Sequence, residues 1–180
     1  LNQITTVADA ISDLLQSNGV MPCPDRKGFS AGIYSKTKSK FQEVMRKECE
    51  KDRIIPDSHS FANHNKDTVI LFKTLLEEYP QRNKRIENKE REHWNIKKRG
   101  ITILDMNGIS PTLTTHYAEP RILTVREYAR LQTFPDWYEI KKKYTTGGKL
   151  RKIEVPRYTQ IGNAIPPLFG ELAGIVLKEM

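Results

Sequence analysis

A Gly-Asn-Ala turn near the end of the chain has the residue types best suited to meet a ligand. The turn, Gly162-Asn163-Ala164, runs into Pro166-Pro167, and proline is typical of the first turn of a helix. Glycine has no side chain, so another molecule can approach its backbone closely. The pattern therefore predicts a place where the backbone meets a ligand. A plain helix start of structural value only is the alternative, because no phosphate loop, metal cluster or obvious nucleophile precedes it in the sequence.

The cysteines and histidines do not form a recognisable reactive or metal-binding set. Cys23 and Cys49 are too few for a disulfide framework and too far apart for a metal knuckle, so we expect reduced thiols. No cysteine or carboxylate completes a ligand set around His59 and His64. The sequence therefore predicts structural histidines and no metal site.

The charge of the chain favours a polyanionic partner. The chain has 30 Lys and Arg against 22 Asp and Glu, a net charge of +8. Most of the surplus lies in 36–99 and in a lysine-rich cluster within 141–152. Nucleic acid is the favoured partner, although a solvated basic face has the same composition. We expect a cytoplasmic protein, because the sequence has neither a long apolar run nor a beginning typical of a signal peptide.

Two groups of basic residues are candidates for contact with DNA. Arg126 and Arg130 are four residues apart and share one face of a predicted helix, which suits either DNA phosphates or internal carboxylates. Trp94 is followed by a second basic group that could interleave with DNA. A tryptophan packed at the foot of an exposed arm is equally consistent with that pattern. The members of the second group are Lys97, Lys98 and Arg99.

The elements that would position these residues are the short helices and strands of an α+β fold. Two capping boxes, Thr6 with Asp9 and Thr124 with Glu127, mark helix starts. Apolar residues three and four apart predict further helices, and short β-branched runs predict strands. The predicted helices cover 6–15, 38–51, 67–79, 124–133 and 166–177, the strands 101–104 and 112–115, a loop 19–33 and an exposed arm 81–99.

Two segments of the second half are more specific than a generic helix or turn. They are RILTVREYARLQTFPD at 121–136 and QIGNAIPP at 160–167. In this order they resemble the last two sequence motifs of the DNA cytosine-C5 methyltransferases. The resemblance is tight over 110–180. Further segments that resemble the same family are Val7–Leu14, Phe61–His64 and Ser110–Thr115.

Several motifs of that family do not occur in these 180 residues. Whole members begin with a glycine-rich turn for S-adenosylmethionine. They also have Pro-Cys-Gln with the nucleophilic cysteine, Glu-Asn-Val with an assisting acid, and an arginine motif. Met21-Pro22-Cys23-Pro24 lacks the glutamine. The resemblance therefore implies that this chain contains no catalytic residue and is inactive alone.

The resemblance also implies a role for the Gly-Asn-Ala turn. Gly162, Asn163 and Ala164 would line the S-adenosylmethionine pocket, with Asn163 offering amide hydrogen bonds. The implied partners are double-stranded DNA and the catalytic half of the enzyme, on the same polypeptide or a separate subunit. A non-catalytic DNA-binding or regulatory remnant is the alternative function.

The resemblance finally implies how the chain is organised. The last helix would pack on a Rossmann-like methyltransferase domain absent from this chain. With that helix left uncovered, the isolated chain would self-associate through 165–180 or leave that stretch mobile. The expected parts are a helix following the catalytic core at 1–15, a small target-recognition domain at 16–140, a basic loop at 141–157, and the C-terminal motif with its helix at 158–180.

Overall fold

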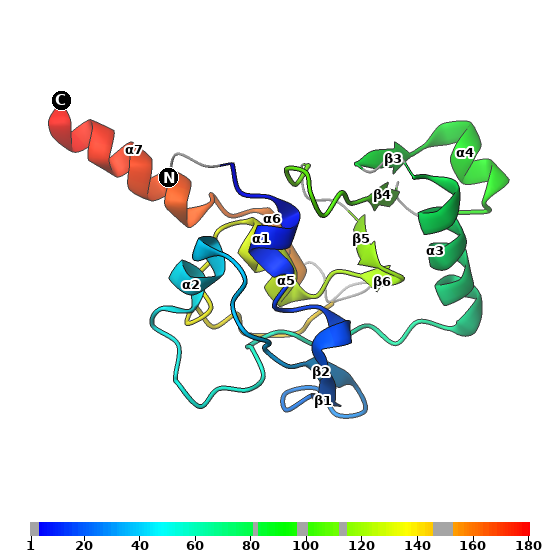
Figure 1. Ribbon diagram of the computed structural model, residues 1–180, viewed down its shortest axis with the longest axis horizontal. Coiled ribbons are helices and arrows are strands. Elements are labelled where there is room, and N and C mark those ends of the chain that lie inside the picture. The colour runs from blue at the N-terminus through cyan, green and yellow to red at the C-terminus, as the bar shows by residue number, and fades with distance from the viewer. Residues whose placement is uncertain (1–3, 81–82, 97–100, 112–114, 146–152) are drawn as a thin grey trace.

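The protein has an α+β fold in which a central group of helices lies between a small sheet and a projecting C-terminal helix (Figure 1). The computed structural model describes residues 4–80, 83–96, 101–111, 115–145 and 153–180. The α+β class and the short strands agree with the sequence-based expectation.

The centre of the molecule is built from the two helices that begin with capping boxes. These helices are α1 (Val7–Ile11) and α5 (Val125–Leu131). In each, the side chain of the cap threonine accepts a hydrogen bond from the backbone amide three residues later, and the acidic side chain at that later position accepts one from the amide of the threonine. The apolar side chains of α1 form a buried core with three leucines, against which part of α5 packs. Both helices are shorter than the sequence predicts. The leucines are Leu14, Leu104 and Leu123.

A four-stranded sheet lies beside this centre (Figure 1). Its middle pair is parallel, and the two outer pairs are antiparallel. Helix α3 (Lys66–Glu78) packs Phe72 and Leu75 against the sheet, in the helix predicted over 67–79. In order across the sheet, the strands are β3 (Lys84–Ile86), β4 (Ile101–Ile103), β5 (Thr115–Glu119) and β6 (Arg121–Ile122).

The charged segment 81–99 contains regular structure where the sequence predicts an exposed arm. Strand β3 and helix α4 (Asn88–His93) lie within it, and Ile86 is fully buried against α3. Trp94 joins the same cluster, and its indole N–H donates to the hydroxyl of Tyr79 at 3.1 Å. The packed-tryptophan alternative is therefore the one found. The prediction of an arm was wrong because one buried isoleucine among charged residues leaves no visible periodicity.

A hairpin occupies the segment 19–33, which the sequence predicts to be a loop. Strands β1 (Val20–Pro22) and β2 (Ser30–Gly32) pair in antiparallel fashion after a short 3-10 helix at Gln16–Asn18. A Cβ on Gly32 would meet His59 Nε2 at 2.4 Å, so only glycine lets the hairpin pack on that ring. The helix predicted over 38–51 is present as the shorter α2 (Lys40–Arg46).

The last two helices differ in how they contact the body of the molecule. Helix α6 (Arg157–Gly162) packs Ile161 into a core cluster with α5. Helix α7 (Pro167–Glu179) begins at the proline pair, as predicted, and none of its residues is buried. It extends away from the other elements (Figure 1). In the described part of the chain, no helix combines the length and apolarity needed to cross a membrane.

Candidate functional site

The arginines of α5 point into the protein. Arg130 is fully buried and donates to both oxygens of Asp136, at 2.5 and 2.6 Å, and to both oxygens of Asp13, at 3.2 Å. Its remaining bond goes to the carbonyl of Ala10 at 2.9 Å, so all five N–H donors of the guanidinium group are used. Burial opposes the charge on Arg130, but the two carboxylates outweigh it and raise its pKa.

Arg126 is equally enclosed. It donates to the carbonyl and a carboxylate oxygen of Asp57, at 2.9 and 3.0 Å, and to the carbonyl of Tyr138 at 2.8 Å. It has no exposed surface. The prediction that Arg126 and Arg130 contact DNA is therefore corrected to its alternative, internal scaffolding. Their donors are already paired inside the fold. A phosphate would have to displace carboxylates, of which those of Asp13 and Asp136 are themselves buried.

A second ion-pair cluster joins Arg121 to the cap of α5. Arg121 donates to both oxygens of Glu127, at 2.8 and 2.7 Å, and also binds Glu119. Burial opposes ionisation of Glu127, but Arg121 outweighs that effect and lowers the pKa of the carboxyl. Glu127 also accepts the amide of Thr124 at 2.7 Å. One carboxylate therefore completes the capping box and neutralises an arginine.

His59 connects this cap to the segment that follows α1. Its Nε2 lies 2.7 Å from the carbonyl oxygen of Leu14, and its Nδ1 lies 2.7 Å from the hydroxyl of Thr124. A carbonyl can only accept, so Nε2 has the proton and Nδ1 accepts from the threonine. Burial lowers the pKa of His59 to about 4, which keeps the ring neutral. His59 is thus a structural link between two elements.

The Gly-Asn-Ala turn lies at the surface. Asn163 ends α6 and is exposed, and no hydrogen bond joins its side chain to any residue that the structure describes. A Cβ on Gly162 would meet nothing within 4 Å, so contacts within the chain do not require glycine there. Ala164 packs against the core cluster of α5 and α6. The turn is therefore held in place by the packing of Ala164, while Gly162 and Asn163 are exposed to solvent.

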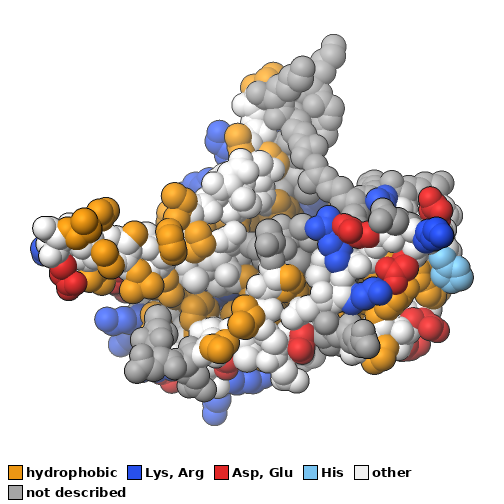
Figure 2. Space-filling model, turned by 90° about the horizontal axis from the view of Figure 1, so that it is seen from above, with side chains coloured by type: hydrophobic (Ala, Val, Ile, Leu, Met, Phe, Trp, Pro, Cys, Tyr) orange, Lys and Arg blue, Asp and Glu red, His pale blue; other side chains and the backbone are white. Residues whose placement is uncertain are grey.

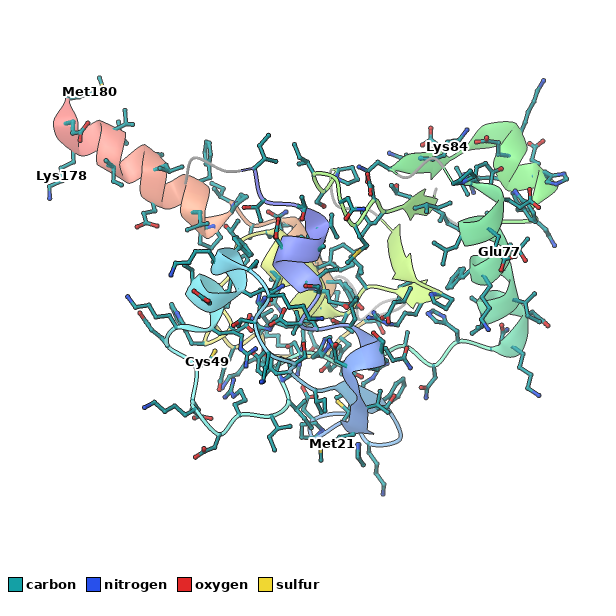
Figure 3. All side chains as sticks on the ribbon, viewed as in Figure 1. Met21, Cys49, Glu77, Lys84, Lys178 and Met180 are labelled. Atoms are coloured by element: carbon teal, nitrogen blue, oxygen red, sulfur yellow. The ribbon has the colours of Figure 1, made fainter. Side chains whose placement is uncertain are left out.

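Helix α7 presents apolar side chains to solvent. Phe169, Leu172 and Leu177 are 64, 60 and 71 % exposed. Hydrophobic side chains follow the projecting helix in Figure 2, and Figure 3 places Lys178 and Met180 at its far end. A Cβ on its two glycines would meet nothing within 4 Å, so another element could pack closely at both. These glycines are Gly170 and Gly174.

A depression of about 230 Å³ opens at the base of α7. Its walls come from α1, α2, α5 and the first turn of α7, and include Val7, Phe41, Leu131 and Leu168. The apolar surface of α7 therefore continues into a hollow of the central body. The turn directly precedes α7 in the chain, and Leu168 of α7 lines the hollow. We call the turn, the helix and the hollow together the C-terminal surface.

Neither cysteine is set up as a nucleophile. Cys23 is 8 % exposed and donates to a carboxylate oxygen of Asp25 at 3.1 Å. Burial raises the pKa of Cys23, and burial also raises the pKa of Cys49. Asp25 is held by two further donors, the hydroxyl of Tyr144 at 2.9 Å and Arg157 at 2.6 Å. Cys23 is therefore part of a structural cluster that ties the hairpin to the C-terminal segment.

The remaining candidates for DNA contact are the basic group that follows Trp94 and the lysine-rich cluster within 141–152. Lys97, Lys98 and Arg99 lie outside the described residues. In the lysine-rich cluster, Lys141 pairs with Glu139 at 2.6 Å and Lys143 pairs with Glu154 at 3.4 Å. These lysines are exposed, and their acidic partners offset part of their charge.

The sequence matches a known family of enzymes. Residues 5–178 match the family of C-5 cytosine-specific DNA methylases. The chain belongs to that family. The family uses S-adenosylmethionine, and the match confirms the resemblance inferred from the two C-terminal motifs.

Curated relatives are type II methyltransferases. M.AquIB of Picosynechococcus is 40 % identical over an alignment of 84 residues, and this alignment covers 42 % of this chain and 60 % of that protein. M.NgoFVII of Neisseria gonorrhoeae is 34 % identical over 114 residues, which are 63 % of this chain and 25 % of that protein. The chain thus spans less than two thirds of these relatives.

A solved structure shares the fold. It is described as a DNA modification methyltransferase encoded within a prophage (E. coli), with a TM-score of 0.53 and 24 % sequence identity. The likeness covers 93 % of this chain but 44 % of that one. More than half of the solved protein therefore has no counterpart in these 180 residues.

Proposed function

We propose that this chain is the target-recognition and C-terminal portion of a DNA cytosine-C5 methyltransferase. The whole enzyme would transfer a methyl group from S-adenosylmethionine to C5 of a cytosine in DNA. This portion would recognise DNA and complete the donor pocket. The single observation that supports this assignment best is the C-terminal surface, on which a family motif and an apolar helix both face outward.

The donor pocket would receive one wall from the Gly-Asn-Ala turn. The exposed amide of Asn163 has both donors and acceptors free for a polar ligand among the described residues. Gly162 leaves open space in front of its backbone, and the packing of Ala164 holds the turn in place. These features fit one side of a site for S-adenosylmethionine. The other walls would come from the catalytic segment.

The nucleophile would also come from the catalytic segment. C5 methylation needs a thiolate that adds to a base flipped out of the helix. A raised pKa and a bond to Asp25 keep the Cys23 thiol protonated. A short relative supports a catalytic segment on a separate chain. The alignment covers 42 % of this chain but 60 % of M.AquIB, so that methyltransferase is shorter than this chain.

DNA contact would rest on basic residues outside α5. Lys97, Lys98 and Arg99 remain the proposed group, since Arg126 and Arg130 are enclosed. We expect weak, salt-sensitive binding by the chain alone. The logarithm of the affinity should fall by about 0.9 per log unit of salt for each phosphate neutralised. A titration with duplex DNA at two salt concentrations measures this slope, and binding that does not respond to salt would contradict it.

Reconstitution tests the assignment directly. The chain would be mixed with a separately expressed catalytic segment of a family member that contains Pro-Cys-Gln and Glu-Asn-Val, and labelled donor would report methylation. We expect no transfer by either part alone and turnover by the mixture. Asn163→Ala should raise the KM for the donor, whereas Asn63→Ala, which removes another exposed amide, should leave that KM unchanged. DNA binding without turnover in any mixture would favour the regulatory-remnant alternative.

A further inference from the structure

Thr133 closes helix α5 in a conformation that normally requires glycine. Its φ is 62°, in the left-handed region that a β-branched residue rarely adopts. The amide of Thr133 donates to the carbonyl of Arg130 at 2.9 Å, and that of Phe134 donates to the carbonyl of Ala129 at 2.8 Å. This bond pair defines a Schellman motif with Thr133 at the position where glycine predominates. The local structure of α5 therefore gives no reason for threonine.

The start of α7 supplies a reason. Pro166 and Pro167 have no amide hydrogen, and no side chain of the preceding residue caps the helix. The amides of Phe169 and Gly170 both donate to the carbonyl of Pro166, at 3.0 and 3.1 Å. The amide of Leu168 remains, and it donates to the hydroxyl of Thr133 at 3.1 Å. Thr133 thus caps a helix that begins more than thirty residues later in the chain.

We propose that Thr133 is a positioning residue that fixes the direction of α7 relative to α5. Within the described residues, its hydroxyl makes the only hydrogen bond or ion pair that joins α7 to the body of the molecule. The backbone strain at Thr133 places that hydroxyl in front of the Leu168 amide. A consequence for catalysis, that donor affinity depends on Thr133 through the angle of α7, rests on the proposed function.

Electron paramagnetic resonance distances test the direction of α7 in this chain alone. Spin labels at Lys178→Cys on α7 and Glu43→Cys on α2, in a Cys23→Ser and Cys49→Ser background, would report the angle between helix and body. Labelled chain diluted into unlabelled chain restricts the signal to distances within one molecule. We expect a narrow distribution for the parent and for Thr133→Ser, which keeps the hydroxyl.

Two variants separate the hydroxyl from the strain. Thr133→Val keeps the shape and loses the hydroxyl, and Thr133→Gly loses the hydroxyl but relieves the backbone. We expect both to broaden the distribution and to speed amide exchange at Leu168 about tenfold, the equivalent of one hydrogen bond. A narrow distribution in Thr133→Val or Thr133→Gly would overturn the proposal, and Thr133→Gly serves if the valine variant does not fold.

The catalytic consequence is measured in the reconstituted enzyme. The KM for S-adenosylmethionine should rise about tenfold in Thr133→Val and return to normal in Thr133→Ser, with kcat changed less. An unchanged KM with a broadened distance distribution would refute the link to the donor pocket and leave the positioning role intact. If the parent mixture has no activity, the proposed function fails, and the distance measurement still decides the role of Thr133.

Discussion

Helices α5 and α7 both come from motifs of one enzyme family, yet they use their side chains in opposite ways. In α5, Arg126, Glu127 and Arg130 have no exposed surface, and each is fully engaged by internal partners. In α7, the apolar Phe169 and Leu172 are more exposed than buried. Charged side chains are buried in α5, and apolar side chains are exposed to solvent in α7.

This contrast separates two kinds of motif. The charges of α5 stabilise the chain's own fold, because unpaired buried charges are costly and these are paired. The apolar side chains of α7 contribute little to the fold of this chain, because solvent still covers them. A motif whose side chains are satisfied internally is structural, and a motif whose apolar residues remain exposed is directed toward another segment.

Removal of Arg130 should have the largest effect. Arg130→Gln leaves Asp13 and Asp136 without a counter-charge in the interior, and breaking such a buried pair costs about 3–5 kcal/mol. Urea unfolding measures the loss. Arg85→Gln is the matched control, because this exposed arginine has a single surface ion pair and should change stability by less than about 1 kcal/mol. Equal effects of the two substitutions would remove the contrast between inside and outside charges.

The second-largest effect should be a loss of stability in acid, caused by protonation of His59 in the unfolded chain. The pKa of His59 is about 4 in the folded chain against 6.5 ordinarily, so the unfolded chain binds more protons between these values. Stability is full above pH 6.5 and falls as the pH approaches 4, by about 3 kcal/mol. Urea unfolding at a series of pH values measures this loss.

A variant isolates the contribution of His59. His59→Gln can still donate to the Leu14 carbonyl, and it should lack most of the slope between pH 6.5 and 5. The pKa of His64 is also lowered by burial, and this residue is present in both proteins, so its contribution cancels in the comparison. An unchanged slope in the variant would mean that His59 is not the group responsible.

Truncation on α7 should have the smallest effect on the isolated chain. Leu172→Ala should change the free energy of unfolding by less than about 0.5 kcal/mol, because its side chain is exposed. Leu75→Ala in α3, a helix of the same 13-residue length, should cost about 2–5 kcal/mol. Binding of the catalytic segment should reverse the order, with Leu172→Ala weakening it more. A large loss in the isolated chain would show that α7 packs internally.

The sequence predicted those helices and strands that are determined by residues close together in the chain. The capping boxes at Thr6 and Thr124, the proline start of α7 and the periodic helix α3 were all predicted, because neighbouring residues determine them. The strand at Ile101–Ile103 was likewise predicted from its β-branched residues. These are features that a few adjacent side chains specify.

Features that depend on distant partners were missed. The β1–β2 hairpin depends on the packing of Gly32 on His59, and β3 depends on a single buried Ile86. The sequence left open whether Arg126 and Arg130 face inward or contact DNA, because one acidic partner of each lies far away in sequence. Asp57 is 69 residues from Arg126, and Asp13 is 117 residues from Arg130. Acids within mostly apolar segments, such as Asp13 in ISDLL, were the only available signal.

The bond between Arg130 and Asp13 has a consequence for how the chain is made. During synthesis, Asp13 must wait for an arginine that is added 117 residues later. At a translation rate of about 5–20 residues per second, this delay is roughly 6–23 s. For that time Asp13 has no arginine from α5, and α5 does not yet cover its part of the apolar face of α1. A nascent chain interrupted before residue 130 would therefore present an unshielded segment to chaperones and proteases.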